Sequence, residues 1–253
     1  MGMIVSKVAI ITGGGTGIGR SSALALQKDD FTVVVCGRRM DLLKETVSLG
    51  MSDKPTMHPV VTDVSSGKSV AKLFATVRKK YGRLDLLFNN AGMGAPRVPF
   101  DELGEADWRR CVDINLTGTF LCAREAFKIM KDQKPQGGRI INNGSVSAHN
   151  PRPDTVAYTA TKHAVTGITK SIALDGRAYN ISCSQLDIGN ADTAIGKRFK
   201  KGVPQANGKV MVEPVIDPDQ CGKALAYMAG LPLGTNVLNM TLMATNMPFV
   251  GRG

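Results

Sequence analysis

A short apolar segment, followed at once by a glycine-rich loop and a helical pattern, constrains this chain most. Residues 7–12 (KVAIIT) are apolar and β-branched and predict a buried strand. Residues 13–20 (GGGTGIGR) would let backbone N–H groups approach a phosphate, and the pattern at 22–26 predicts a helix whose N-terminus attracts negative charge. A plain tight turn is the alternative, but this order of elements favours a dinucleotide-binding unit.

Strand and helix patterns alternate along the rest of the chain. Further strands are predicted at 31–36, 57–62, 84–88, 139–143, 181–186 and 237–243, and helices at 69–81, 105–131, around 158–177 and 218–229. Such alternation predicts an α/β, Rossmann-like, doubly wound parallel sheet with both faces covered. We expect one domain over 1–253, with a mobile substrate loop at 192–214, a region rich in Lys and Gly.

Composition indicates an ordinary globular protein, with 43% hydrophobic and 21% charged residues. The five cysteines are scattered and form no Cys-x-x-Cys pair, which predicts reduced thiols and a cytoplasmic location. His58, His149 and His163 have no metal-ligand spacing, so no metal site is predicted. The apolar segments are too short to span a bilayer and no secretory signal is evident, so we expect no membrane partner.

The formal net charge of +11 raises the question of an anionic partner. The basic residues are spread along the chain without interleaved aromatic residues, which favours a dispersed basic surface over nucleic-acid binding. The loop at 192–214 is itself basic and could select an acidic or phosphorylated substrate, although a solvated face is favoured. Its basic residues are Lys197, Arg198, Lys200, Lys201 and Lys209.

The residues after the second predicted strand bear on cofactor choice. An NAD-binding unit would carry an acidic residue there for the ribose hydroxyl, but the sequence has Gly37-Arg38-Arg39. Two arginines suit a 2′-phosphate, so NADP(H) is favoured while NAD(H) stays possible. Solvated charges at a helix start are the alternative interpretation.

Tyr158 and Lys162 are four residues apart and would share one face of a helix. An ammonium group near a phenol favours the phenolate, so such a tyrosine can exchange a proton with a carbonyl or alcohol oxygen. A packed ring beside a solvated ammonium is the alternative when the pair is considered alone.

Taken together, the motifs resemble those of the short-chain dehydrogenase/reductase family, in its shorter single-domain branch. Residues 12–19 (TGGGTGIG) match the family's Thr-Gly-x-x-x-Gly-x-Gly loop, and residues 89–92 (NNAG) match its Asn-Asn-Ala-Gly motif. Ser145 lies thirteen residues before Tyr158, the usual family spacing, and Asn115 lies in the expected long helix.

The resemblance implies a catalytic role for Asn115, Ser145, Tyr158 and Lys162. Tyr158 would donate or accept the proton, and Lys162 would favour its ionised form and hold the nicotinamide ribose. Ser145 would hydrogen-bond the substrate oxygen. Asn115 would kink its helix and bind a water feeding a proton relay to Lys162.

The resemblance and the motifs also imply a set of cofactor-binding residues. These are Gly13, Thr16, Gly17, Ile18, Gly19, Arg38, Arg39, Asp63, Val64, Asn90, Ala91, Gly92, Tyr158, Lys162 and Thr193. Gly13 and Gly17–Gly19 would line the pyrophosphate, Asp63 and Val64 the adenine, and Thr193 the nicotinamide carboxamide. The chain departs from the family after the sixth strand, where Ile188-Gly189 replaces the frequent Pro-Gly.

The predicted function is an NADP(H)-dependent oxidoreductase that interconverts a ketone or aldehyde and an alcohol on a small molecule. A non-enzymatic NADP(H)-sensing or scaffold protein is the alternative, and an anion-binding protein is a weaker one. By analogy with the family we expect a homo-oligomer, a tetramer or a dimer. His149, Asn150 and Arg152 could border the substrate, but solvated loop residues are favoured.

Overall fold

The computed structural model describes residues 6–250, and these form a parallel sheet with strand order β3-β2-β1-β4-β5-β6-β9. The strands are β1 (Val8–Thr12), β2 (Thr32–Gly37), β3 (Met57–Val61), β4 (Leu86–Asn89), β5 (Gly138–Asn143), β6 (Ile181–Ile188) and β9 (Asn239–Leu242). The chain runs outward from β1 to β3 and then returns to β4 beside β1. This confirms the predicted doubly wound sheet and places a switch point where β1 meets β4.

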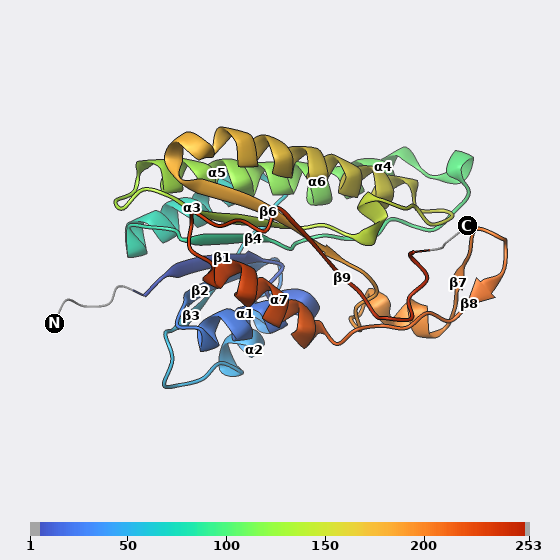
Figure 1. The fold of residues 1–253 in the computed structure, drawn as a ribbon, viewed down its shortest axis with the longest axis horizontal. Coiled ribbons are helices and arrows are strands. Elements are labelled where there is room, and N and C mark those ends of the chain that lie inside the picture. Colours follow the sequence, from blue (N-terminus) through green and yellow to red (C-terminus); the bar gives the residue numbers. More distant parts are fainter. Residues whose placement is uncertain (1–5, 251–253) are drawn as a thin grey trace.

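Helices cover both faces of the sheet (Figure 1). One face carries α1 (Gly17–Lys28), α2 (Met40–Ser48) and α7 (Pro218–Gly230), and the other carries α3 (Gly67–Tyr81), α4 (Glu105–Val112), α5 (Gly118–Asp132) and α6 (Val156–Asp175). Successive strand residues point to opposite faces, so Ile11 and Phe88 belong to one core while Ile10 and Leu87 belong to the other. Two fully buried cores therefore hold the strand ends in fixed positions.

The structure differs from the sequence-based expectations mainly in irregular regions. The helix expected over 105–131 is divided into α4 and α5 by a π-helical turn, Asp113–Thr117. Helix α2 was not predicted. The segment 192–214 contains the 3₁₀ helix η5 (Gly196–Lys200) and a small antiparallel pair, β7 (Val203–Pro204) and β8 (Val210–Met211). Further 3₁₀ turns are η1 (Phe100–Glu102), η3 (Val146–Ala148) and η4 (Arg177–Tyr179).

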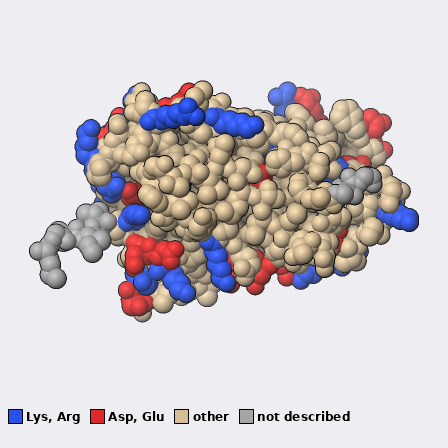
Figure 2. All heavy atoms as spheres, viewed as in Figure 1, with Lys and Arg blue, Asp and Glu red and all other residues tan. Residues whose placement is uncertain are grey.

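The surface agrees with a dispersed basic charge on the face seen in Figure 2. Basic and acidic side chains are interspersed around the edge of this face, and its centre is mostly uncharged. Over residues 6–250, no helix combines the length and apolar character needed to cross a bilayer.

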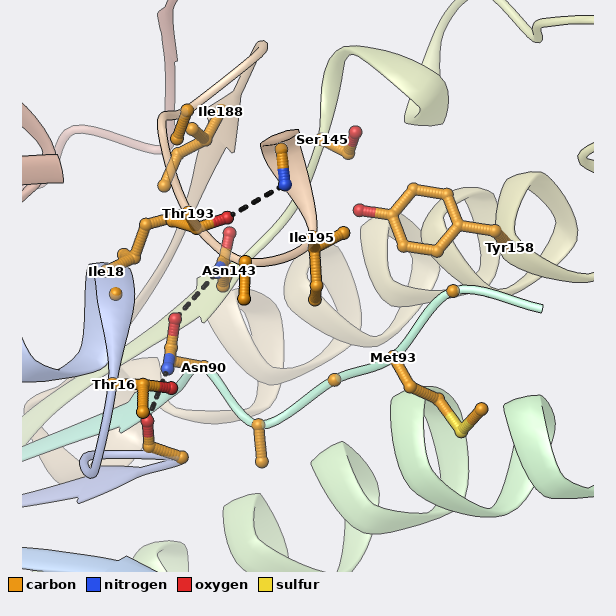
Figure 3. A pocket seen from close by; sticks show the side chains of 18 of the residues that line it. Thr16, Ile18, Asn90, Met93, Asn143, Ser145, Tyr158, Ile188, Thr193 and Ile195 are labelled. Atoms are coloured by element: carbon orange, nitrogen blue, oxygen red, sulfur yellow. Dashed lines mark hydrogen bonds between the residues drawn. The ribbon is translucent and has the colours of Figure 1, made fainter. Parts of the chain in front are cut away.

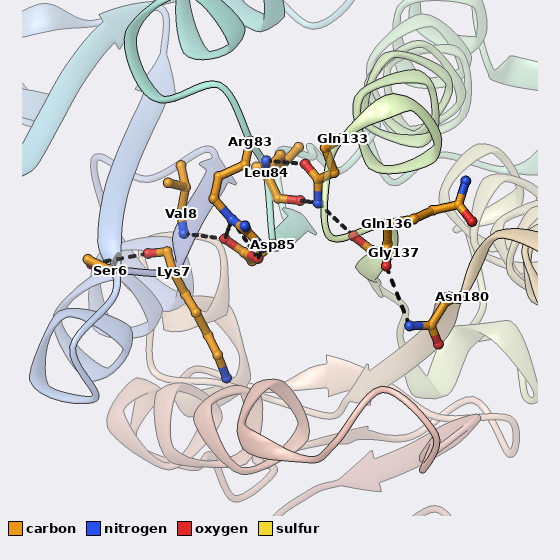
Figure 4. Close-up of polar contacts among 10 residues, drawn as sticks. All are labelled: Ser6, Lys7, Val8, Arg83, Leu84, Asp85, Gln133, Gln136, Gly137 and Asn180. Atoms are coloured by element: carbon orange, nitrogen blue, oxygen red, sulfur yellow. Dashed lines mark hydrogen bonds and ion pairs between the residues drawn. The ribbon is translucent and has the colours of Figure 1, made fainter. Parts of the chain in front are cut away.

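A buried glutamine ties together the amino-terminal ends of β4 and β5, at the edge opposite the glycine loop (Figure 4). Gln133 accepts a hydrogen bond from Leu84 N at 2.7 Å and donates to Leu84 O at 3.0 Å and Gly137 O at 2.6 Å. Its side chain thus satisfies three backbone groups that would otherwise be buried without partners.

We predict that Gln133→Ala lowers the free energy of unfolding by about 2–3 kcal/mol, because it leaves these buried backbone groups unpaired. Urea unfolding followed by circular dichroism would measure this loss. Gln136→Ala is the matched control, since Gln136 is partly exposed and its side chain bonds only Lys131 O, and a change of about 0.5 kcal/mol or less is expected. Equal effects of the two substitutions would contradict the assigned role.

Candidate active site

A cavity of about 350 Å³ lies at the carboxyl ends of the strands and runs from the end of β2 to η5. Fifteen of the seventeen predicted site residues line it: Gly13, Thr16, Gly17, Ile18, Arg38, Arg39, Asp63, Val64, Asn90, Ala91, Gly92, Ser145, Tyr158, Lys162 and Thr193. The two that do not line it are Gly19 and Asn115, which contact residues that do. The topology thus brings together residues far apart in the sequence at one edge of the sheet.

The glycine loop requires glycine at particular positions. Gly17 has a φ of +51°, and a Cβ there would lie 2.9 Å from Thr193 Cγ2. A Cβ on Gly19 would lie 2.2 Å from Gly13 O, so this residue shapes the loop from behind the cavity wall. Thr16 is the N-cap of α1 but makes no side-chain cap hydrogen bond. The first backbone N–H groups of α1 therefore face the cavity, and none of them donates a hydrogen bond to the side chain of the N-cap residue.

A chain of hydrogen bonds connects the glycine loop to Lys162 across three strands. Asn90 donates through Nδ2 to Thr12 O at 2.9 Å, and Asn143 Nδ2 donates to Asn90 Oδ1 at 2.9 Å (Figure 3). Lys162 Nζ then donates to Asn143 O at 2.6 Å. Thr12 Oγ1 accepts from the backbone N–H groups of Asn90 and Ala91, both at 2.9 Å. Thr12 opens the loop motif matched in the sequence but was given no role there, and Asn143 was not singled out as a site residue.

Tyr158 and Ser145 face the same part of the cavity. The Tyr158 ring extends from α6 with its hydroxyl directed toward the loop that carries Ser145 (Figure 3). The Lys162 Nζ lies 5.5 Å from the centroid of that ring, and the Lys162 side chain is buried. Ser145 Oγ accepts a hydrogen bond from Ser147 N at 3.1 Å, which fixes the oxygen and leaves its O–H free to donate.

Asn115 lies in the π-helical turn, the place where the resemblance implies a kink. Its side chain pairs with the backbone of Met93, accepting from Met93 N at 2.8 Å and donating to Met93 O at 2.9 Å. Nδ2 also lies 3.3 Å from Thr161 Oγ1, on the helix of Tyr158. Asn115 thus holds the segment after β4 against α6 from behind the cavity wall.

The end of the cavity near β2 and β3 carries Arg38, Arg39 and Asp63. Both arginines are exposed at the start of α2. The pKa of Asp63 is lowered, first by the hydrogen bond from the Ser65 hydroxyl and, as a smaller cause, by the charge of Arg38. Among the described residues that line the cavity, Asp63 is the only carboxylate.

A buried carboxylate beneath Ser145 was also missed. Asp187 is fully buried and accepts from Ser145 N at 2.8 Å and Gln185 Nε2 at 2.8 Å through Oδ1. Its Oδ2 lies 2.7 Å from His149 Nε2 and accepts from Asn239 Nδ2 at 2.7 Å. His149 is therefore bound to the protein and is partly exposed. No sequence motif marked Asp187, because its acceptors are satisfied by residues distant in the chain.

Arg152 is buried, so the expectation of a solvated loop residue is wrong for this position. Its guanidinium makes two hydrogen bonds of 2.5 Å to the Glu213 carboxylate, which also accepts from Asn190 and Gln205. Burial by itself would raise the pKa of Glu213, but the hydrogen bonds from Arg152, Gln205 and Asn190 outweigh it and lower the pKa to about 2. The pair fastens the end of segment 192–214 to the loop before α6.

The basic residues of this segment do not form one solvated face. Lys197, Lys200, Lys201 and Lys209 are exposed, as expected, but Arg198 is only partly exposed and lines the cavity. Arg97, which the sequence reasoning did not single out, lines the same region.

Comparison with known proteins gives the family. The profile of the short chain dehydrogenase family matches residues 7–203. A 3β-hydroxysteroid dehydrogenase of Mediterraneibacter gnavus is 36% identical over 198 residues, which cover 78% of this chain and 71% of that protein. The chain therefore belongs to the short-chain dehydrogenase/reductase family. It is an oxidoreductase of the class that acts between CH–OH and C=O groups.

Solved structures share the fold over nearly the whole chain. A 3-ketoacyl-(acyl-carrier-protein) reductase of Brucella melitensis, complexed with NADH, has a TM-score of 0.82 at 26% identity and covers 95% of this chain and 98% of its own. An alcohol dehydrogenase of Thermococcus sibiricus, complexed with 5-hydroxy-NADP, has a TM-score of 0.83 at 24% identity, with 95% and 97% covered.

We predict that Glu213→Gln lowers the free energy of unfolding by about 3 kcal/mol at pH 7, because it leaves the buried Arg152 charge without a carboxylate. The pKa of Glu213 is lowered in the folded protein, so the carboxylate stabilises the fold above its unfolded pKa of about 4.3. The difference between wild type and variant should shrink as the pH falls from there towards about 2. Urea unfolding at stepped pH would measure it.

Asp192→Asn is the control in the same segment, since its ion pair with Lys200 is exposed on both sides and should contribute about 1 kcal/mol or less. If the difference in free energy of unfolding between wild type and Glu213→Gln stays constant from pH 7 to pH 3, the effect does not come from the charge of Glu213.

Proposed function

We propose that the chain is an NADP(H)-dependent oxidoreductase that interconverts a ketone or aldehyde and an alcohol by hydride transfer, with Tyr158 as proton donor and acceptor. The observation that carries the proposal is the arrangement of Tyr158, Ser145 and Lys162 around one cavity, which also holds the glycine loop. Hydrogen bonds to the protein hold Ser145 and Lys162, and all three residues are of types suited to proton transfer or oxyanion stabilisation.

The residues of the cavity fit a nicotinamide dinucleotide. Gly17 of the glycine loop has no Cβ and so leaves space beside Thr193. The backbone N–H groups at the start of α1, which have no side-chain cap, are suited to bind a pyrophosphate. Arg38 and Arg39 would hold a 2′-phosphate, Asp63 and Val64 the adenine, and Lys162 the nicotinamide ribose. The bound nicotinamide would supply or accept the hydride.

The protein side of the reaction concerns the substrate oxygen. Ser145 Oγ, held by Ser147 N, would donate its O–H to the carbonyl oxygen and stabilise the negative charge that develops there. Tyr158 would give its phenolic proton to that oxygen during reduction and take it back during oxidation. The Lys162 ammonium would stabilise the phenolate left on Tyr158, and its bond to Asn143 O keeps it in place. Asn115, in the π turn, would act as a positioning residue, because its hydrogen bond from Met93 holds the segment that follows β4.

We predict that Tyr158→Phe reduces kcat by about 10²–10⁴-fold, because the ring is kept but the proton is lost. NADPH binding should change by only a few-fold, as a fluorescence titration would report, because the ring and Lys162 remain. Tyr227→Phe is the control, since Tyr227 is exposed on α7 and does not line the cavity. Normal turnover by Tyr158→Phe would rule out the assigned role, and NADPH binding by wild type with no turnover of any carbonyl would favour a sensor.

Cofactor preference has its own test. We predict that wild type binds NADPH more tightly than NADH, and that Arg38→Ala weakens NADPH binding about tenfold or more while leaving NADH binding almost unchanged. Fluorescence titration of both cofactors would measure the two dissociation constants. Lys44→Ala is the control, because Lys44 is an exposed cation on α2, the helix that follows Arg38, and does not line the cavity. Equal affinity for both cofactors in wild type would show that the two arginines are solvated charges.

A further inference from the structure

Three arginines from three separate segments line the substrate end of the cavity. Arg97 lies before η1, Arg152 before α6, and Arg198 in η5. Tyr158 and Ser145 line the same cavity. Its one carboxylate among the described residues, Asp63, follows β3. Ser145 follows β5, and three strands lie between β3 and β5 in the sheet. Positive charge is thus concentrated on the side of the cavity where the reacting oxygen of the substrate would lie.

Arg152 has a carboxylate partner of its own. Its two terminal nitrogens bind the two oxygens of Glu213, and Nη2 also donates to Asn190 Oδ1 at 3.1 Å. Both side chains are almost completely buried. The charge of Arg152 is therefore used within the protein, and its role is to hold the cavity wall.

Arg97 and Arg198 have no such partner. Within residues 6–250, neither forms an ion pair, and the buried Nε atom of each lacks a hydrogen-bond acceptor. Burial lowers the pKa of Arg97 to about 10, the charges of Arg198 and Arg152 act in the same direction, and the charges of Asp154 and Glu213 oppose them. Buried donors and like charges held together are unfavourable unless an anion compensates them.

Arg198 lines the same cavity as Tyr158 and lies beside Phe199 and Gly94. Its Cζ lies 5.0 Å from the centroid of the Phe199 ring, and its Nη1 lies 3.9 Å from the Cβ position of Gly94. Burial lowers the pKa of Arg198, and the interaction with Tyr158 acts in the opposite direction. Phe199 compensates the cation in part, but it offers no acceptor for the N–H groups.

We propose that Arg97 and Arg198 bind an anionic group, a carboxylate or a phosphate, on the carbonyl or alcohol substrate. This inference rests on the proposed function, since it names the substrate class of the same site. Guanidinium groups bind the oxygens of both anions through paired N–H donors. An anion held there would compensate the two guanidinium charges and fix the distance between the charged end of the substrate and its carbonyl.

The test compares keto acids with their neutral counterparts. The probes are 2-oxobutanoate, 4-oxopentanoate and 5-oxohexanoate, each beside its methyl ester, and glycerone phosphate beside glycerone. Binding to NADP⁺-saturated protein would be measured by calorimetry, and turnover with NADPH by the loss of its absorbance. We expect at least one anion to bind about tenfold or more tightly than its neutral counterpart, with a matching preference in kcat/KM.

Variants then locate the preference. Arg97→Met/Arg198→Met should abolish it while changing NADPH affinity only a few-fold, and the single substitutions should each reduce it. Lys197→Met/Lys201→Met is the matched control, because both lysines are exposed in the same segment, and it should keep the preference. The comparison of acid with ester in wild type needs no variant, so a double variant that fails to fold does not prevent the test.

The outcomes separate this inference from the proposed function. Turnover of neutral carbonyls with no preference for any anion would overturn the anion site and leave the reductase standing. The anion site would also be overturned if the Arg97→Met/Arg198→Met variant still preferred anions to their neutral counterparts. The same holds if that variant lost NADPH binding and wild type showed no anion preference. Arginine-dependent anion binding without turnover of any probe would support the anion site and count against the proposed reaction.

Discussion

The hydrogen bond from the Asn143 amide to the Asn90 side chain joins the two halves of this molecule. On one side Asn90 holds the backbone of Thr12 and Gly13, and on the other the Asn143 carbonyl holds Lys162. The glycine loop and the helix of Tyr158 therefore share one rigid polar connection through the ends of β1, β4 and β5. The two buried cores keep those strand ends in register, so the connection depends on the packing of the whole sheet.

Buried charge has a second structural role at the other side of the site. Asp187 holds the backbone of Ser145 from below, and Glu213 holds Arg152. In both cases several donors compensate one carboxylate, which is the condition for burying it at all. Among the described residues Arg97 and Arg198 form no ion pair, although the charges of Asp154 and Glu213 act on Arg97. This absence of a paired carboxylate is the contrast on which the proposed anion site rests.

Much of the fold and of the cofactor cavity could be predicted from the sequence because the signals are local. The glycine loop, the Tyr158–Lys162 spacing and the strand patterns depend on neighbours a few residues apart. Arg152 pairs with Glu213 across 61 residues, and nothing near either residue in the sequence indicates its partner. The same holds for Asp187 and for the burial of Arg198, which depends on how η5 folds over Gly94. The π turn at Asn115 was expected only from the family resemblance, because the helical pattern over 105–131 continues through it.

The segment 192–214 connects the two ends of the cavity. Its Thr193 methyl group lies beside Gly17 of the glycine loop, and Arg198, in η5, lines the cavity with Tyr158. Under the proposed function, this one segment borders both the dinucleotide and the substrate. A displacement of the segment would therefore change both binding sites together.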